Sequence, residues 1–391
     1  MRRIATALVL LLTASPLLAA VATVCTVEAE RLEGEITAIS ADGAVEFVRA
    51  GKTVRLPPGS VHRIRFREMP KPPAFEARVL TVQGTVLLGK LVGSKATLGI
   101  KTPVMKQAMR LGADDLLGVL FAGDERATMD PARFEEALAR PGREADVIFV
   151  ASPKGIVPLD VAVSSVAPDK VRFTWQQQER SVDTAKVAAI VFAGGAATPE
   201  DTATTRLTDG SVLRGGVASL EKDLLTLDVS GQAVVVPVAG VVAVEFANPG
   251  ITYLSALKPA AVRETPFFNR VWKHRLDRSV GGGPLSLDGR TYTRGIGCHT
   301  RTELTYDLGG SYRKFAAVIG IDDEARPRGS VKFIVRLDGR ELLARVLGGR
   351  DRALPVVLDV AGGRRLTLIA DFAEDAHVGD HADWADARLV K

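Results

Sequence analysis

Short runs of alternating apolar and polar residues follow one another along most of the chain. Alternation with a period of two is typical of half-buried β-strands, because successive side chains point to opposite faces of a sheet. Near the N-terminus the runs are Gly34 to Ile39, Val45 to Val48 and Thr53 to Leu56, and Pro57 follows the last of them. The pattern therefore predicts an all-β protein whose short antiparallel strands are joined by tight turns.

Four of these runs end alike, in a short apolar alternation that closes on a phenylalanine. They are Val61 to Phe66, Leu116 to Phe121, Val187 to Phe192 and Val241 to Phe246. The closing phenylalanines are spaced by 121 − 66 = 55, 192 − 121 = 71 and 246 − 192 = 54 residues. Such spacing fits a small barrel better than a two-element solenoid repeat. We predict four copies of one β-barrel-like module, with repeat 1 at residues 23–70, repeat 2 at 71–125, repeat 3 at 146–196 and repeat 4 at 197–250.

The fourth copy shows the plan of the repeat most clearly. Asp209-Gly210 lies between two apolar runs and predicts a hairpin turn. A second hairpin is predicted from Leu224 to Val236 around Ser230-Gly231, and Pro237 ends it because proline cannot donate a backbone hydrogen bond. Short strands, tight turns and a closing strand resemble the Sm-like and SH3-like barrels. This resemblance implies that each repeat is a small module of its own.

Two other segments break the alternation. In residues 126–145, Asp130 is the predicted N-cap of a connector helix and Pro131 its first residue. Phe134 and Leu138, four residues apart, lie on one face of that helix. Residues 251–266 contain Pro259 and lack the alternation, so we predict that they form a linker into the last module.

The N-terminus has the three regions of a secretory signal. Arg2 and Arg3 precede the uncharged apolar run Ile4 to Leu18, which is followed by Ala20-Val21-Ala22. We predict a signal peptide at residues 1–22, cleaved after Ala22, and export to the periplasm, the cell surface or the extracellular space. An uncleaved membrane anchor is the alternative, but the run is short for a span of about 20 residues. No second apolar run of this kind follows, so no membrane span is expected after signal removal.

Charge and cysteine content narrow the range of functions. The formal net charge of the 391-residue chain is +5, and the basic residues are dispersed rather than clustered, so binding to nucleic acid is not expected. Cys25 and Cys298 are the only cysteines, and one pair so far apart in sequence is no disulfide framework. Whether they pair stays open, and Cys298 is better explained as a buried strand thiol.

The C-terminal third carries a denser set of motifs. It includes Gly295-Ile296-Gly297-Cys298-His299, Gly320-Ile321-Asp322-Asp323, Gly329-Ser330-Val331-Lys332-Phe333, Asp338-Gly339 and the closing segment Asp380 to Leu389. In order and spacing these motifs resemble the NPCBM domain, a family of carbohydrate-binding modules. We assign the resemblance to residues 267–391. Cys298 departs from the family pattern, which usually has an aliphatic residue there.

The resemblance implies a galactose-binding-like antiparallel β-sandwich, or jelly roll, that binds a glycan, with galactose-like sugars as the expected class. The residues support the fold independently. Lys332 to Leu337 alternate, Asp338-Gly339 marks a turn, and Leu354 to Val360 and Leu366 to Ala370 are predicted strands. The fold class is therefore all-β, with small SH3/Sm-like barrel repeats followed by this sandwich.

A polar set in the C-terminal module contains the candidate site residues. The ligand-binding candidates are His299, Asp322, His377, Asp380, His381 and Trp384. The candidates for a structural calcium ion are Asp322, Asp383 and Asp386. No other cofactor is indicated.

Three interpretations of this set stay open. The carboxylates can cap turns by accepting backbone N–H bonds. They can supply the hard oxygen ligands that calcium prefers. Together with the imidazoles they can line a sugar site, in which an aromatic ring stacks on the sugar and polar groups satisfy its hydroxyls. Trp384 is the aromatic candidate, although core packing is the commoner role of a tryptophan in a closing strand. Zinc binding by His377 and His381 is disfavoured because Gly379 and Asp380 indicate a loop.

No catalytic signature is present. The chain lacks Gly-x-Ser-x-Gly, His-Glu-x-x-His and a complete dinucleotide-binding loop. Asp322 and Asp323 are adjacent, so in a strand they would point to opposite faces and could not flank one glycosidic bond. We therefore predict an exported, non-catalytic carbohydrate-binding protein. The alternative is a structural or protein-interaction role with an envelope protein as partner, and an unrecognised hydrolase is a third hypothesis.

Overall fold

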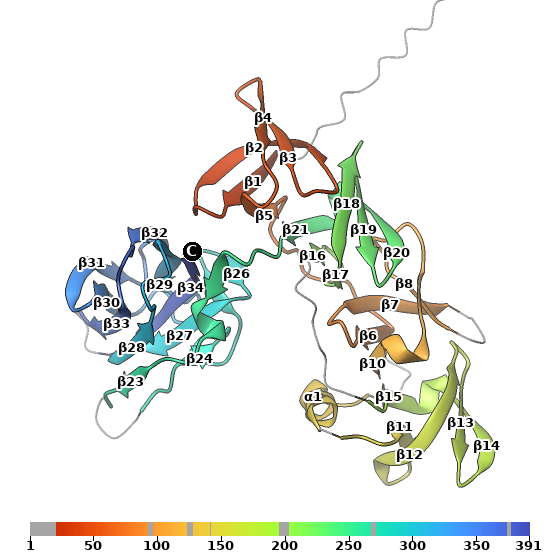
Figure 1. Ribbon diagram of the computed structural model, residues 1–391. Coiled ribbons are helices and arrows are strands. Elements are labelled where there is room, and N and C mark those ends of the chain that lie inside the picture. Colours follow the sequence, from red (N-terminus) through yellow and green to blue (C-terminus); the bar gives the residue numbers. More distant parts are fainter. Residues whose placement is uncertain are drawn as a thin grey trace, which may run out of the picture.

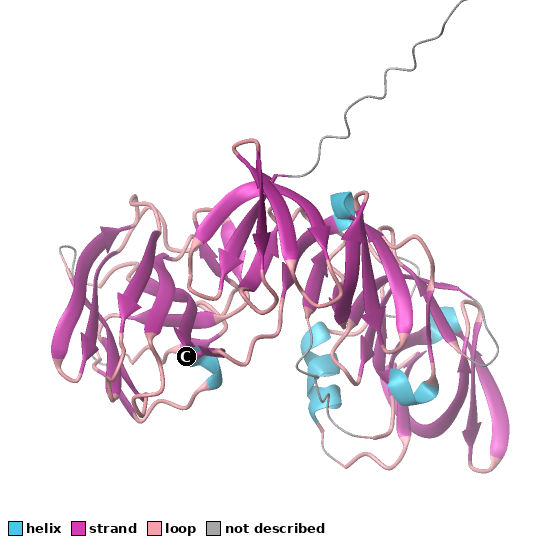
Figure 2. Cartoon of the chain, turned by 45° about the horizontal axis from the view of Figure 1, so that its top comes forward, coloured by secondary structure: helices cyan, strands magenta, loops and turns pink. Residues whose placement is uncertain are grey.

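The computed structural model describes residues 21–92, 97–122, 128–140, 142–194, 203–266, 271–373 and 377–391. Apart from loops and a few short helices, these residues form β-strands (Figure 2). Two parts are apparent in Figure 1: the repeats, coloured red to green, and a C-terminal sandwich, coloured teal to blue. The predicted all-β class is confirmed. Residues 1–20 of the predicted signal peptide lie outside the described residues.

The four repeats share one strand plan. Their strands are β1 (Val21–Thr26), β2 (Arg31–Ile39), β3 (Val45–Arg49), β4 (Lys52–Leu56) and β5 (Val61–Arg65) in repeat 1; β6 (Ala77–Thr81), β7 (Val86–Val92), β8 (Leu98–Lys101), β9 (Met109–Leu111) and β10 (Leu116–Phe121) in repeat 2; β11 (Asp146–Ser152), β12 (Gly155–Val166), β13 (Lys170–Trp175), β14 (Gln178–Asp183) and β15 (Val187–Val191) in repeat 3; and β16 (Thr204–Leu207), β17 (Val212–Arg214), β18 (Gly216–Glu221), β19 (Leu224–Val229), β20 (Gln232–Pro237) and β21 (Val241–Glu245) in repeat 4.

In every repeat the first four strands form an antiparallel meander, and the closing strand returns to pair with the first. In repeat 4 the second strand is divided into β17 and β18. A single 3-10 turn precedes the closing strand in repeats 2, 3 and 4, at Ala113–Asp115, Thr184–Lys186 and Val238–Gly240. The closing strands are the four segments whose pattern ends on phenylalanine. The likeness of the repeats to Sm-like or SH3-like barrels stays a prediction.

The repeats are not arranged in space in the order of the sequence. The closing strands pair across repeats, β5 with β21 and β10 with β15, so repeat 1 joins repeat 4 and repeat 2 joins repeat 3. A pairing between β17 and β7 joins repeat 4 to repeat 2. The spatial order is therefore 1–4–2–3, with repeat 3 at the end farthest from the sandwich (Figure 1).

Local sequence accounts for the turns and the helix. The Asp209 side chain accepts a hydrogen bond from the Ser211 backbone N–H at 2.8 Å, and Gly210 adopts the positive φ of +88° that the turn requires. The helix α1 (Pro131–Ala139) begins with Asp130 as its N-cap, which accepts from the Ala132 N–H at 2.8 Å. Phe134 and Leu138 of α1 are buried in a core shared with β10 and β15.

The sandwich consists of two antiparallel sheets around an aliphatic and aromatic core. One sheet has the order β24-β27-β34-β29-β32, with β22 on β34, and the other β23-β28-β33-β30-β31, while β25 and β26 form a separate hairpin. Their bounds are β22 (Ile251–Tyr253), β23 (Ala261–Glu264), β24 (Arg275–Leu276), β25 (Leu285–Leu287), β26 (Arg290–Tyr292), β27 (Gly295–His299), β28 (Thr302–Asp307), β29 (Lys314–Ile321), β30 (Ser330–Leu337), β31 (Arg340–Gly348), β32 (Leu354–Asp359), β33 (Arg365–Phe372) and β34 (His381–Val390).

One predicted boundary needs correction. Residues 251–266 are not a linker, because β22 pairs with β34, β23 pairs with β28, and a 3-10 turn, Leu254–Ala256, lies between β22 and β23. These strands have only three and four residues, too few to show alternation. The strand β1 begins at Val21, so the last two residues of the predicted signal lie in it, and the cleavage site after Ala22 stays a prediction.

The two cysteines are free thiols in this structure, and Cys298 is buried within β27. Within the described part of the chain, no helix has both the length and the apolar character needed to cross a membrane.

Candidate functional site

Four aromatic rings meet at one end of the sandwich. His299 is the last residue of β27 and His381 the first of β34, and the two residues are paired in the strand register. His377 lies in the turn before β34, and Trp272 lies just before β24. We call these four residues the ring cluster. The central sheet thus fixes two of its members, and adjoining loops supply the other two.

The ring cluster is built around His299. The Trp272 ring stacks on His299 with 5.1 Å between centroids and an interplanar angle of 9°. Ring centroids of His299 lie 5.8 Å from His381 and 6.3 Å from His377, and the Trp272 and His381 centroids are 5.7 Å apart. This arrangement combines a flat aromatic face with several imidazole nitrogens.

Hydrogen bonds set the orientation of two of the imidazoles. His299 is 3% exposed, and its Nδ1 lies 2.8 Å from the Thr300 carbonyl oxygen. Burial lowers the pKa of His299, so the neutral ring donates from Nδ1 and keeps Nε2 as a hydrogen-bond acceptor. The His381 Nδ1 lies 2.8 Å from Glu324 Oε1, which also accepts from the Gly281 N–H at 3.1 Å.

The predicted carboxylates beside the ring cluster hold loops in place. Asp380 is fully buried and accepts from the Thr300 hydroxyl at 2.6 Å and the Ser330 N–H at 2.9 Å. Asp322, 1% exposed, accepts from the backbone N–H groups of Ser286 and Glu324 at 3.0 and 2.9 Å. Both follow the turn-capping interpretation of the sequence.

Trp384 is not positioned to contact a ligand. It is 1% exposed, and its ring meets the Phe333 ring edge-on at 5.2 Å in the sandwich core. The sequence interpretation of Trp384 as a ligand-binding aromatic is therefore wrong. The tryptophan that lies beside the predicted histidines is Trp272.

Of the three carboxylates predicted to bind calcium, Asp322 and Asp383 are neighbours, whereas Asp386 lies apart from them. Burial and the neighbouring Asp322 raise the pKa of Asp383 well above its usual range, which disfavours the charged form that a cation would need. Asp386 is instead bound by two arginines elsewhere in the molecule. Among the described residues, no group of three or more His, Cys, Asp or Glu side chains could hold a metal ion.

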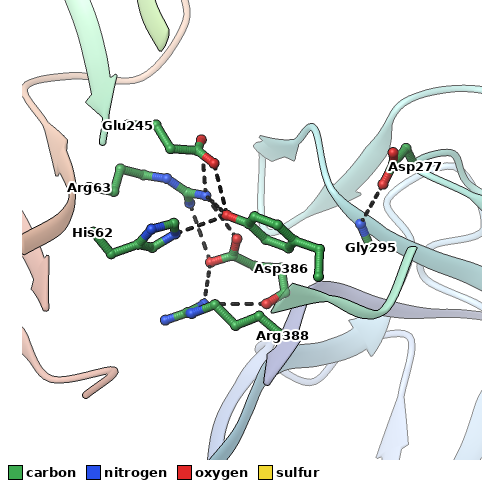
Figure 3. Close-up of polar contacts among 8 residues, drawn as sticks. His62, Arg63, Glu245, Asp277, Gly295, Asp386 and Arg388 are labelled. Atoms are coloured by element: carbon green, nitrogen blue, oxygen red, sulfur yellow. Dashed lines mark hydrogen bonds and ion pairs between the residues drawn. The ribbon is translucent and has the colours of Figure 1, made fainter. Parts of the chain in front are cut away.

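A second polar cluster joins the sandwich to the repeats (Figure 3). Arg63 of β5 binds Asp386 of β34 through two hydrogen bonds of 2.8 and 3.3 Å, and Arg388 contacts the same carboxylate at 2.8 Å. All three residues are buried. Burial alone would raise the pKa of Asp386, but Arg63 and Arg388 outweigh it and hold that pKa well below its usual range.

The same cluster contains a hydrogen-bonded chain that runs from His62 through Tyr253 to the Glu245 carboxylate. The Tyr253 hydroxyl donates to Glu245 Oε1 at 2.8 Å and lies 2.9 Å from His62 Nε2. Because the Tyr253 hydroxyl donates its only proton to Glu245, its oxygen accepts a hydrogen bond from His62 Nε2. Burial, together with Arg63 and Arg388, lowers the pKa of His62 to about 4. His62 is therefore neutral at pH 7.

Four residues in or beside these two clusters were not predicted from the sequence: Trp272, Glu324, Arg63 and Tyr253. Trp272 stands in a stretch without strand alternation, and an aromatic residue in a loop next to a predicted sandwich is the one signal that could have identified it. In the alternating run Val61 to Phe66, the sequence predicts that Arg63 is an ordinary solvent-facing strand residue. Its partner Asp386 is 323 residues away in sequence, so no local pattern connects the two.

Comparison with known proteins gives one family for part of the chain. Residues 250–390 match the family model of the NPCBM/NEW2 domain. The chain is 35% identical over 120 residues to "Alpha-1,3-galactosidase B" of Akkermansia muciniphila, covering 29% of this chain and 15% of the relative. It is 32% identical over 110 residues to "Putative endo-alpha-N-acetylgalactosaminidase" of Renibacterium salmoninarum, covering 28% of this chain and 7% of the relative.

Among solved structures, the chain is similar to the CBM51 module of Clostridium perfringens GH95 in complex with methyl-galactose, with 26% sequence identity and a TM-score of 0.33. That match covers 36% of this chain and 99% of the other. The chain spans only 7% and 15% of the length of the two curated relatives. Within this chain, residues 250–390 are an NPCBM/NEW2 domain.

Proposed function

We propose that this chain is an exported, non-catalytic protein that binds a glycan at the ring cluster of its NPCBM/NEW2 domain. The observation that carries the proposal is the stacking of Trp272 on His299, with His377 and His381 beside them. The three histidines are also ligand-binding candidates predicted from the sequence. The family match supports binding rather than catalysis as the role of the module.

The chemistry of the ring cluster suits a sugar. A sugar ring has an apolar C–H face, which an aromatic ring can cover, and hydroxyls that must keep hydrogen bonds when they leave water. The neutral His299 retains one acceptor nitrogen, and His381 with Glu324 supplies further polar atoms. The names of two relatives, a galactosidase and an N-acetylgalactosaminidase, favour galactose-type sugars as the first ligands to test.

Binding is best tested with the full chain on a glycan array, followed by calorimetric titration of the glycans that bind. Trp272→Ala is expected to weaken binding at least tenfold, about 1.4 kcal/mol, because it removes the flat aromatic face. His381→Ala should weaken binding to a smaller extent. The matched control is Trp175→Ala, since Trp175 is 37% exposed in repeat 3 and is not part of the ring cluster.

Two outcomes would contradict the proposal: no binding to any glycan at high protein concentration, or equal binding by the wild type and a folded Trp272→Ala variant. Hydrolysis of aryl galactosides or N-acetylgalactosaminides by the purified chain would contradict its non-catalytic part.

A second candidate function is attachment to an envelope protein through the repeats. A cavity of about 630 Å³ between α1 and repeat 3 favours it, because apolar residues such as Val147, Phe149 and Val191 line it beside charged ones. Co-purification of one stable protein partner, lost on Phe149→Ala and insensitive to added sugar, would support this function.

A further inference from the structure

A cavity of about 190 Å³ lies between repeat 4 and the sandwich, beside the polar cluster of Figure 3. Repeat 4 contributes Arg206 of β16 and Arg214 at the end of β17, and the sandwich contributes Arg294 just before β27. The ring cluster is at the opposite end of β27, about 13 Å away along the strand if each residue advances about 3.3 Å. The cavity is thus distinct from the proposed sugar site.

Two of the three arginines have no acidic partner among the described residues. Arg294 is fixed by an ion pair of 3.0 Å with Asp277, and its guanidinium lies 5.8 Å from the centre of the Tyr253 ring. Neither Arg206 nor Arg214 makes an ion pair or a side-chain hydrogen bond within the described part of the chain. Arg206 and Arg214 also project from the same face of adjacent paired strands.

The lining therefore has an excess of positive charge. Its only carboxylate, Glu245, is already 3.4 Å from Arg63 and accepts the Tyr253 hydroxyl. His62, which also lines the cavity, is neutral because its pKa is about 4. Burial lowers the pKa of both Arg206 and Arg214, and together with repulsion from neighbouring arginines it outweighs the attraction of Glu245, which raises the pKa of each. Unpaired cations that repel each other in a partly desolvated cavity gain from a bound anion.

We propose that this cavity binds a tetrahedral oxyanion, either free or as an ester group on a sugar, through Arg206, Arg214 and Arg294. The planar guanidinium group presents paired donors that match sulfate and phosphate oxygens. Because the three arginines come from both parts of the molecule, the bound anion also ties the sandwich to repeat 4.

The first experiment titrates inorganic sulfate into the full chain at constant ionic strength, with chloride as the compensating ion, and follows binding by calorimetry. Arg206→Gln and Arg214→Gln should each weaken sulfate binding at least tenfold. The matched control is Arg172→Gln, because Arg172 is an exposed strand arginine of repeat 3 outside the cavity, and it should leave binding unchanged. Without sulfate, Arg206→Gln should raise the melting temperature, since it removes a buried charge whose desolvation and repulsion by other arginines outweigh its attraction to Glu245.

A second arm compares galactose 6-sulfate with inorganic sulfate and with unsubstituted galactose. If inorganic sulfate binds and its binding depends on Arg206, the site accepts free anions. If only the sugar sulfate binds, and its binding depends on Arg206, the site recognises an ester group on a sugar. Trp272→Ala should not change sulfate binding. The anion site can therefore be tested even if the ring cluster binds no sugar. Equal sulfate affinities in the wild type, Arg206→Gln and Arg214→Gln, or no binding of either sulfate, would overturn the proposal.

Discussion

At the residue scale, the chain places its three tryptophans in three different environments. Trp272 stacks on a histidine at the end of the sandwich, Trp384 is enclosed in the core against Phe333, and Trp175 is 37% exposed near a hairpin turn. The same side chain therefore serves as a candidate binding face, as core volume or as solvent-exposed surface. The three tryptophans differ in how far neighbouring side chains shield their rings from water.

Trp384→Ala should cost about 3–5 kcal/mol of unfolding free energy, because it removes the largest fully buried side chain and leaves a cavity. Trp175→Ala should change the unfolding free energy by less than about 0.5 kcal/mol. Urea denaturation of the full chain, monitored by circular dichroism, measures both. Similar losses in the two variants would show that Trp384 is not part of the sandwich core.

At the element scale, the second strand of three repeats has a glycine where it stops pairing with the first strand and begins pairing with the third. The residues are Gly34, Gly89 and Gly215. A Cβ atom would lie 2.6 Å from the Val48 carbonyl oxygen at Gly34, and 2.2 Å and 2.0 Å from the carbonyl oxygens of Lys101 and Asp228 at the other two positions. The strand can bend over its neighbour only where no side chain intervenes.

Gly215→Ala should therefore destabilise repeat 4 by about 1–3 kcal/mol, since the methyl group would collide with the β19 backbone. The adjacent Gly216 is the matched control, because a Cβ atom there would meet nothing within 4 Å. Gly216→Ala should be neutral or slightly stabilising. Urea unfolding midpoints of the two variants measure this difference. Equal midpoints would contradict the claim that the bend in the strand requires glycine at position 215.

Elements that depend on local signals could be predicted from the sequence. The hairpin at Asp209-Gly210, the N-cap Asp130 and the closing strands each have their cause within a few residues. Strands β22 and β23 were missed because their partners, β34 and β28, lie far away in sequence. His299, His377 and His381 were found by residue type alone, whereas their approach to Trp272 depends on how the loops fold.

At the whole-molecule scale, the repeats and the sandwich are joined mainly by charged groups. Besides the buried pair of Arg63 and Asp386, Glu28 of repeat 1 lies 2.8 Å from Arg313 and 2.7 Å from Lys314. Hydrogen bonds from Arg313 and Lys314 lower the pKa of Glu28 to about 2. Removing one partner of a buried ion pair leaves an uncompensated charge. The joint between the two parts is therefore specific, and it should respond to pH.

Acidification should weaken this joint first through His62. An unfolded histidine takes up a proton near pH 6.5, whereas His62 in the folded protein does so only near pH 4. Between these values the unfolded chain binds more protons, so the free energy of unfolding falls as the pH falls, by up to about 3 kcal/mol. The Glu28 contribution is present above about pH 4.5 and is lost only as the pH approaches 2, so the two windows differ.

Urea unfolding of the full chain at pH 7, 5.5 and 4.5 measures the slope of stability against pH. His62→Gln keeps an N–H donor for the Tyr253 hydroxyl but does not titrate, so this variant should lose less stability between pH 7 and 4.5 than the wild type does. His299 also has a lowered pKa and contributes in the same direction, so His299→Gln is the companion variant that separates the two histidines. If His62→Gln and the wild type have the same slope, His62 is not a neutral buried group in the joint, and the pH response of the molecule has another origin.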